Sequence, residues 1–76
     1  MEVLAQVKAI LVEQFFKEAD DINMDASFVD DLDVESLDFV ELLLALEDEY
    51  ELVISDEEAE KIRTVGDVVQ LIEERQ

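Results

Sequence analysis

The chain contains no cysteine, no histidine, no proline and no tryptophan, and only one glycine among its 76 residues. Without cysteine or histidine it has no disulfide framework, no zinc site of the usual kind, no thiolate nucleophile and no imidazole base. Basic residues are also scarce: 5 Lys and Arg stand against 23 Asp and Glu, for a formal charge of −18. Because binding to a phosphate backbone needs a basic surface, this balance argues against nucleic acid as a partner.

Long apolar runs are missing as well. None approaches the ~20 residues of a membrane span, and no basic segment opens the chain, so we expect a cytoplasmic protein with no membrane span. Hydrophobic residues nevertheless make up 50% of the sequence, too many for a disordered acidic tail. With no linker or internal repeat, the sequence predicts a single domain over residues 1–76, and we expect a monomer. We also expect salt or divalent cations to stabilise it, because the like charges repel one another.

Apolar residues follow helical spacing in three places. The first stripe covers about four turns and consists of Val3, Leu4, Val7, Ile10, Leu11 and Phe15. The last stripe begins at the Ser/Thr-x-x-acid capping spacing of Thr64 and Asp67 and consists of Val65, Val68, Val69 and Ile72. Between them, Ser55 begins a capping-box pattern that predicts a short helix through Ala59 and Ile62.

The remaining helix, from Ser36 to about Tyr50, is apolar on more than one side. One stripe suits the core and consists of Phe39, Leu42, Leu43, Leu46 and Tyr50. A second stripe, Leu37, Val40 and Leu44, points elsewhere. A helix of this kind is either central to a bundle or presents a face to a partner. Because the best strand candidate, residues 52–54, has no second strand to pair with, the pattern predicts an all-α four-helix bundle with three main helices and one short helix.

Residues 18–35 form a long loop rich in Asp, Asn and Ser. We expect its apolar residues to pin it to the core; these are Ile22, Met24, Phe28, Val29 and Leu32. The spacing from Ser27 to Asp30 also fits a capping box, which predicts a short helical turn there. Loops this long are uncommon in small domains and tend to be functional.

An acidic cluster at the end of this loop invites a calcium interpretation; it consists of Asp30, Asp31, Asp33 and Glu35. An EF-hand loop starting at Asp31 would need glycine at its sixth position and glutamate at its twelfth, where the chain has Ser36 and Leu42. The EF-hand interpretation fails, and we expect no dedicated metal site. Loose cation binding here or at residues 47–49 stays open beside the alternative of a solvated acidic face.

The carboxylates give no sign of catalysis either. They lack a neutralising partner, an evident pocket and any nucleophile beyond three serines, so we expect the chain not to be an enzyme.

Ser36 allows two interpretations. It follows an acidic loop and stands at the start of a helix, where backbone N–H groups are unpaired and the helix dipole is positive. It could simply cap the helix, as serine often does. It could instead be a covalent attachment point, because an attached phosphodiester would lie at a site suited to anions.

The surrounding sequence resembles acyl carrier proteins of the free-standing bacterial kind. The likeness covers nearly the whole chain and is carried by residues 26–32, 35–38, 40–42, 45–50, 56–62 and 64–65, and more weakly by Val7, Lys8, Ile10, Glu13 and Gln14. The Asp-Ser-Leu type of motif at residues 35–37 is short by itself, but in these flanking sequences it is specific.

The resemblance implies a cofactor, a cargo and a pocket. Ser36 would receive 4′-phosphopantetheine from coenzyme A, through a phosphopantetheinyl transferase that uses magnesium. Acyl groups would then be carried as thioesters on its thiol. Candidates for the pocket that takes the acyl chain are Phe28, Leu42, Leu46, Ile54, Ala59 and Ile62; each is equally suited to being plain core.

The resemblance also gives the second stripe of the Ser36 helix a role as the face presented to partner enzymes. That face would consist of Leu37, Asp38, Val40, Glu41, Leu44, Glu47 and Asp48. Its acidic rim would meet basic patches on acyl-transferring and fatty-acid or polyketide synthesis enzymes, in fast, weak and salt-sensitive encounters.

The sequence departs from the family pattern next to the serine. Asp33 replaces a usual glycine, Val34 a usual small residue and Glu35 a usual aspartate, and Ser55 replaces a frequent proline. Asp33 is expected to adopt the positive φ that glycine would have used. These changes leave open whether the chain is a housekeeping or a specialised carrier.

The sequence thus favours a non-catalytic acyl carrier for fatty acid or related lipid biosynthesis. Two alternatives stay open: a carrier of another cargo, such as a polyketide intermediate or an activated amino acid, and an acidic protein-interaction module in which Ser36 is only a cap.

Overall fold

The structure is a computed structural model that describes residues 3–75. Its helices are α1 (Val3–Phe15), η1 (a 3₁₀ turn, Ala19–Asp21), α2 (Ser36–Tyr50), α3 (Asp56–Glu60) and α4 (Val65–Arg75). The described residues contain no strand, and residues 52–54 belong to neither a helix nor a strand. The predicted all-α bundle of three main helices and one short helix is confirmed. None of these helices has both the length and the hydropathy needed to cross a bilayer.

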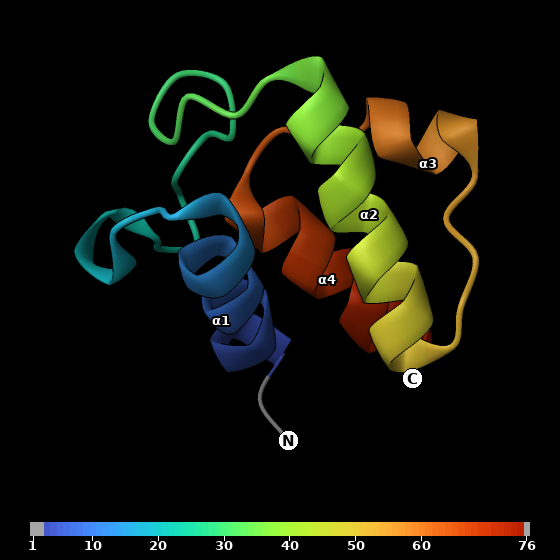
Figure 1. Cartoon of the computed structure of the whole chain (residues 1–76). Coiled ribbons are helices and arrows are strands. Elements are labelled where there is room, and N and C mark those ends of the chain that lie inside the picture. Colours follow the sequence, from blue (N-terminus) through green and yellow to red (C-terminus); the bar gives the residue numbers. More distant parts are fainter. Residues whose placement is uncertain (1–2, 76) are drawn as a thin grey trace.

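The three long helices pack around one core. Helix α1 contacts both α4 and α2, and the short α3 lies beside the first turns of α2 (Figure 1). In the described part of the chain every fully buried residue is hydrophobic. The predicted stripes of α1 and α4 face this core, since four members of each are buried and Leu4 and Phe15 are partly buried against it. Burial of these stripes supplies the main driving force for folding.

Helices α3 and α4 begin at hydrogen-bonded caps, as their sequence patterns predict. At α3, the Ser55 hydroxyl accepts from the Glu58 N–H at 3.2 Å, and the Glu58 carboxylate accepts from the Ser55 N–H at 3.1 Å. At α4, the Thr64 hydroxyl accepts from the Asp67 N–H at 3.2 Å. The Asp67 carboxylate in turn accepts from the N–H groups of Arg63 and Thr64 at 3.0 and 3.1 Å. Helix α3 ends at Glu60, so Ile62 is buried in the segment after it rather than in the helix.

The long loop is fixed by backbone pairing with the start of α4. The Phe28 N–H donates to the Arg63 carbonyl at 3.0 Å, and the Val65 N–H donates to the Ala26 carbonyl at 3.0 Å. Gly66 donates to the Met24 carbonyl at 2.8 Å, and a Cβ at Gly66 would lie only 2.7 Å from that oxygen. The contact therefore requires glycine at this position.

The predictions for the loop's side chains were partly wrong. Ile22, Phe28 and Leu32 are buried as expected, but Met24 and Val29 are exposed, and Ala26 and Val34 are buried in their place. Residues 28–31 form a tight turn, which carries Val29 away from the core. Loop side chains follow such turns rather than a regular period, so their direction is not readable from spacing.

The predicted capping box at Ser27 is also only half correct. The Ser27 hydroxyl accepts from the Asp30 N–H at 3.1 Å, as the pattern requires. The reciprocal bond, at 2.7 Å, runs from the Ser27 N–H to the carboxylate of Asp31 rather than to that of Asp30. The result is a turn that does not continue as a helix.

Candidate functional site

Ser36 is the first residue of α2, and the structure favours one of its two interpretations. The N-cap residue is Glu35, and no side chain caps this helix. Ser36 is exposed, and in the part of the chain that the structure describes its hydroxyl forms no hydrogen bond. The capping interpretation of Ser36 is therefore wrong, and its hydroxyl is exposed at the start of the helix.

The backbone around Ser36 is suited to an anion. The first intrahelical hydrogen bond runs from the Phe39 N–H to the Glu35 carbonyl at 2.8 Å. The N–H groups of Ser36, Leu37 and Asp38 consequently have no partner within the helix. They point out of a helix end that carries a partial positive charge, which would stabilise a phosphodiester on the neighbouring hydroxyl.

The segment before Ser36 is held in a defined shape. Asp33 has φ of 52°, so the expectation that it takes a glycine-like conformation is confirmed. Val34 is buried and its N–H donates to the Phe28 carbonyl at 2.7 Å. Glu35, with φ of −81° and ψ of 163°, then leads extended into the helix. A buried anchor two residues upstream therefore fixes where the exposed Ser36 stands.

A shallow groove begins at Ser36. It has a volume of about 430 Å³ and lies between the start of α2 and α3; its lining residues are Ser36, Phe39, Val40, Asp56, Ala59 and Glu60. Of the residues expected in an acyl pocket, the groove includes Ala59 alone. The groove gives a chain attached at Ser36 a partly apolar surface to lie on.

A second hollow, of about 370 Å³, lies next to the first. It contains two more of the expected pocket residues, Phe28 and Ile62, and is also lined by Phe39. The rings of Phe28 and Phe39 are 5.5 Å apart between centroids and tilted by 57°. The other three expected residues, Leu42, Leu46 and Ile54, are buried and line neither hollow. Sequence reasoning assigned Phe39 only to the core; its place one turn after Ser36 was the signal that could have identified it.

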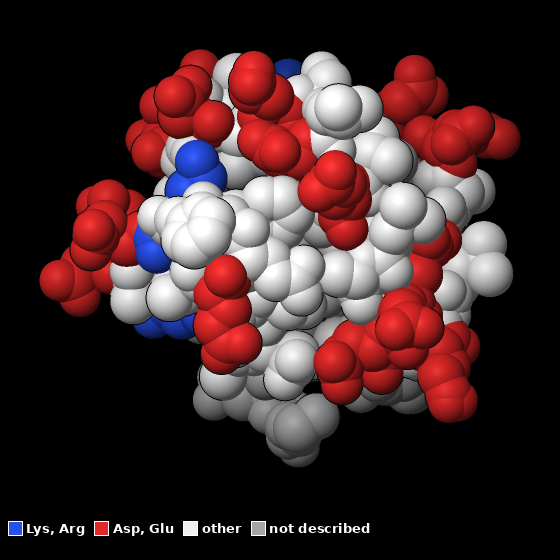
Figure 2. All heavy atoms as spheres, viewed as in Figure 1, with Lys and Arg blue, Asp and Glu red and all other residues white. Residues whose placement is uncertain are grey.

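The second stripe of α2 is exposed, as its spacing indicates. Leu37, Val40 and Leu44 have 74%, 51% and 58% of their surface accessible, whereas Leu42 and Leu46 on the core side have none. Figure 2 shows uncharged atoms across the middle of this view, over α2, with carboxylates around them and most of the visible cations on the α1 side. An apolar strip bordered by acid suits a basic partner surface.

The acidic residues expected at this face differ in their surroundings. Glu41 and Asp48 are exposed, and Asp38 is partly buried. Glu47 is also partly buried, and its carboxylate accepts a 2.6 Å hydrogen bond from the Ile54 N–H. Glu47 therefore holds the segment between α2 and α3 in place, a structural role that its sequence position did not reveal.

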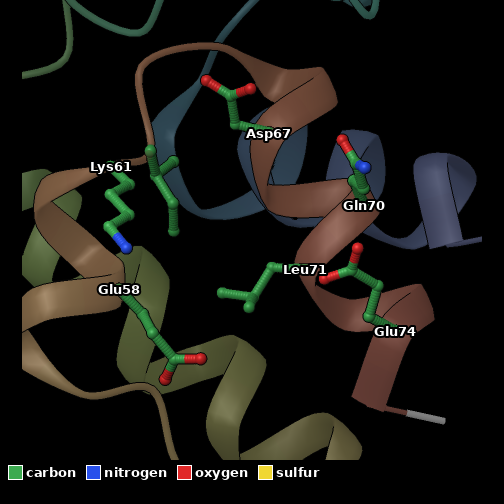
Figure 3. A pocket seen from close by; sticks show the side chains of 7 residues that line it. Glu58, Lys61, Asp67, Gln70, Leu71 and Glu74 are labelled. Carbon is green, nitrogen blue, oxygen red and sulfur yellow. The ribbon is translucent and has the colours of Figure 1, made fainter.

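A further hollow, of about 340 Å³, lies between α3 and α4 and shares no residue with the groove at Ser36. Leu71 points into it from α4, and Lys61 and Glu58 reach toward it from the α3 side (Figure 3). Glu58 also pairs with Arg75, whose guanidinium donates to the Val53 carbonyl at 2.9 Å. The hydrogen bond from Arg75, helped by the capping N–H of Ser55, lowers the pKa of Glu58 from 4.5 to about 2. These contacts of Arg75 tie α4 to α3 and to the segment before it.

One carboxylate of the acidic cluster at the loop end has a local hydrogen-bond partner. The carboxylate of Asp31 is used by the Ser27 N–H. Over residues 3–75, no three acidic side chains converge in a geometry that could hold a metal ion.

Comparison with known proteins points in the same direction as the geometry. A family model described as "Phosphopantetheine attachment site" matches residues 5–72. The acyl carrier protein of Chlamydia trachomatis serovar D is 45% identical over 76 residues, covering 100% of this chain and 99% of that protein. The acyl carrier protein of Helicobacter hepaticus is 48% identical over 73 residues, covering 96% of each. The solved structure of the acyl carrier protein from Enterococcus faecalis superposes with a TM-score of 0.83 at 43% identity, covering 99% of this chain and 95% of that one.

Proposed function

This chain belongs to the acyl carrier protein family, whose cofactor is phosphopantetheine, and on that basis we propose that Ser36 bears the cofactor and that the protein carries acyl chains as thioesters for fatty acid or related lipid biosynthesis. Acyl carrier proteins are carriers, and the chemistry on the cargo belongs to their partner enzymes. We further propose that residues 1–76 act as one carrier domain.

One observation carries the assignment to Ser36. The chain has three serines, and the hydroxyls of Ser27 and Ser55 are both engaged in hydrogen bonds with N–H groups. Ser36 is exposed and lies next to helical N–H groups that have no intrahelical partner, and of the three serines only its hydroxyl makes no hydrogen bond within residues 3–75. A hydroxyl that makes no internal bond loses none when it is esterified.

The attachment is a phosphoryl transfer from coenzyme A. The Ser36 oxygen forms a bond to the phosphorus that bears pantetheine, the pyrophosphate bond of coenzyme A breaks, adenosine 3′,5′-bisphosphate leaves and the hydroxyl proton goes to the transferase or solvent. The product is a phosphodiester at the start of α2. There the free N–H groups and the helix dipole stabilise its negative charge.

The arm supplies a thiol, which the chain itself lacks. With no cysteine in the sequence, no protein thiol competes for the acyl group. The groove lined by Phe39 and Ala59 begins at the attachment point and would be the surface nearest to the arm.

The exposed face of α2 is the proposed contact for the transferase and for synthesis enzymes. Leu37, Val40 and Leu44 provide a small apolar contact, and Glu41 and Asp48 provide exposed charge at its rim. Acid against Lys or Arg patches raises the rate of encounter more than the affinity, which suits a carrier that must leave each enzyme after delivery.

The test is intact-mass spectrometry after incubation with coenzyme A, magnesium and a promiscuous phosphopantetheinyl transferase. We expect the wild type to gain one phosphopantetheine group and Ser36→Ala to gain none. With octanoyl-coenzyme A as donor, the adduct should carry the acyl group and lose it to hydroxylamine, as a thioester does. A wild-type protein that takes up no arm would overturn the carrier role and favour an acidic interaction module.

A further inference from the structure

Helix α1 is apolar on two sides. One side is buried in the core. On the opposite side, Ala5, Ala9 and Val12 recur at intervals of four and three residues, and Phe16 follows Val12 after the same four-residue interval. Ala9 is partly buried and the other three are exposed, Val12 to 36% and Phe16 to 88%. We call these four residues the outer stripe of α1.

Phe16 combines two unfavourable features. Its φ is 58°, a left-handed conformation that glycine adopts freely and that strains a residue with a bulky side chain. The turn itself closes the end of α1, because the Lys17 N–H donates to the Leu11 carbonyl at 3.1 Å. The aromatic ring gains nothing from this turn, since most of it stays in water. An exposed aromatic side chain at a strained position, continuous with an apolar helix face, is typical of a contact surface.

Charged residues border the outer stripe on both sides. In heptad notation Ala9 stands at position a, and Ala5 and Val12 stand at position d. Lys8 then stands at position g and Glu13 at position e, which are the positions whose charges select the partner of a paired helix. Within residues 3–75 neither of these two side chains forms a salt bridge, so both charges are available to a partner.

The order of the two charges favours a parallel pair of identical helices. Around a two-fold axis parallel to α1, the g side of one helix faces the e side of the other. Lys8 of each copy then lies beside Glu13 of the second copy, five positions along. In an antiparallel pair each side would face its own counterpart, and the two sides that carry Lys8 would meet. A second copy in parallel therefore matches both the apolar stripe and the charges at its edges.

The net charge of −18 on each copy opposes pairing, but less at this face than elsewhere. Lys8 and Lys17, two of the five basic residues, lie on or next to α1. Figure 2 accordingly shows most of the visible cations on the α1 side. Because salt screens the repulsion between two charged surfaces, pairing should be weak at low salt and stronger at high salt.

We propose that two copies of this chain pair in parallel through the outer stripe of α1, with Lys8 of each copy beside Glu13 of the other. The contact is small, so the pair exchanges with the monomer, which predominates at low concentration. The outer stripe shares no residue with the groove at Ser36, and pairing leaves that groove open. The inference therefore does not depend on the carrier function.

Analytical ultracentrifugation of the full chain tests the pairing, over concentrations up to the millimolar range and at low and high sodium chloride. For wild type we expect the average mass to rise from one chain toward two, and to do so at lower concentration in high salt. Phe16→Gly suits the backbone but removes the ring, and it should weaken association by about tenfold or more. Val53→Ser is the matched control, because Val53 is 75% exposed in the segment between α2 and α3, and it should associate as wild type does.

An exchange of charges tests the parallel order. Lys8→Glu and Glu13→Lys should each weaken pairing by about threefold or more, since each places like charges side by side at both edges. The double variant Lys8→Glu/Glu13→Lys keeps the net charge of wild type and should restore the pairing. Lys61→Glu and Glu74→Lys make the same two charge changes away from α1 and measure the effect of net charge alone.

Each remaining outcome would overturn the proposal. A chain that stays monomeric at every concentration and salt would leave the outer stripe to a different protein. Association that Phe16→Gly leaves unchanged, or that Val53→Ser weakens equally, would place the contact on another surface. A double charge variant that pairs no better than its single variants would exclude the parallel order. Because glycine relieves the positive φ at residue 16, Phe16→Gly should melt close to wild type, so that a loss of pairing is not a loss of folding.

Discussion

The start of α2 differs from the starts of α3 and α4 in whether side chains bond the unpaired N–H groups. Each helix begins with N–H groups that have no intrahelical partner. At α3 and α4 the pairs Ser55–Glu58 and Thr64–Asp67 satisfy them by reciprocal hydrogen bonds. At α2, Glu35 offers no side-chain bond and the Ser36 hydroxyl stays free. The caps stabilise α3 and α4, whereas the uncapped start of α2 leaves the Ser36 hydroxyl and a positive helix end exposed.

The largest loss of stability should come from replacing Asp67, which caps α4, the longer of the two capped helices. Asp67→Ala removes the acceptor of two backbone N–H bonds, and we expect a loss of about 2 kcal/mol in the free energy of unfolding. The N–H donated by Arg63 is the main cause of the lowered pKa of Asp67, which shows that these bonds favour its charged form. Urea unfolding at neutral pH measures the loss. A change in the free energy of unfolding of less than about 0.5 kcal/mol would show that the α4 cap does not stabilise the fold.

The next effect compares two serines at helix starts. Ser55→Ala removes a cap and should cost about 1 kcal/mol, whereas Ser36→Ala should change stability by about 0.5 kcal/mol or less. Thermal unfolding of the two variants beside wild type tests the contrast directly. Equal losses would mean that Ser36 stabilises α2 after all.

A smaller change in stability is expected from substitutions in the loop that leads to α2, the uncapped helix. Asp33 has positive φ, a conformation that glycine adopts freely and aspartate tolerates, so Asp33→Gly should alter stability by only about 0.5 kcal/mol. Asp33→Val, with a branched side chain at the same φ, should be clearly less stable than Asp33→Gly by thermal unfolding. Equal stability of the two variants would contradict the conformation of this loop.

The smallest effect concerns pH and the exposed pair of Glu58 with Arg75. The folded-state pKa of Glu58 is lowered from 4.5 to about 2, so its charged form stabilises the fold above pH 4.5, and this contribution is lost as the pH falls toward 2. Wild type should therefore be more stable than Glu58→Gln at neutral pH, and the difference should shrink through that window. Being exposed, the pair is screened by salt, and the difference should be small. Parallel melts from pH 7 to pH 2 that keep a constant gap would exclude this linkage.

Most of the helical frame could be predicted from local patterns. The bounds of α2, Ser36 to Tyr50, and the separation of its buried and exposed stripes follow from periodicity, which is a property of the sequence alone. The caps of α3 and α4 were readable for the same reason, since each depends on residues three apart.

The missed features depend on contacts between distant parts of the chain. Backbone bonds to residues 63–66 fix the course of the loop, and the turn at residues 28–31 leaves Val29 exposed. Glu47 turns toward the N–H of Ile54, which no spacing rule could show. The identity of Ser36 as the candidate site was available from the sequence, but whether its hydroxyl caps the helix became clear only from the backbone of Glu35.

The central claim is that the Ser36 hydroxyl, and not a capping serine, bears the arm. The most direct measurement compares Ser36→Ala with the double variant Ser27→Ala/Ser55→Ala, in which Ser36 is the only serine left, after treatment with coenzyme A and transferase. Intact mass should show one phosphopantetheine on the double variant and none on Ser36→Ala. An adduct that survives in Ser36→Ala, or one absent from the folded double variant, would contradict the account.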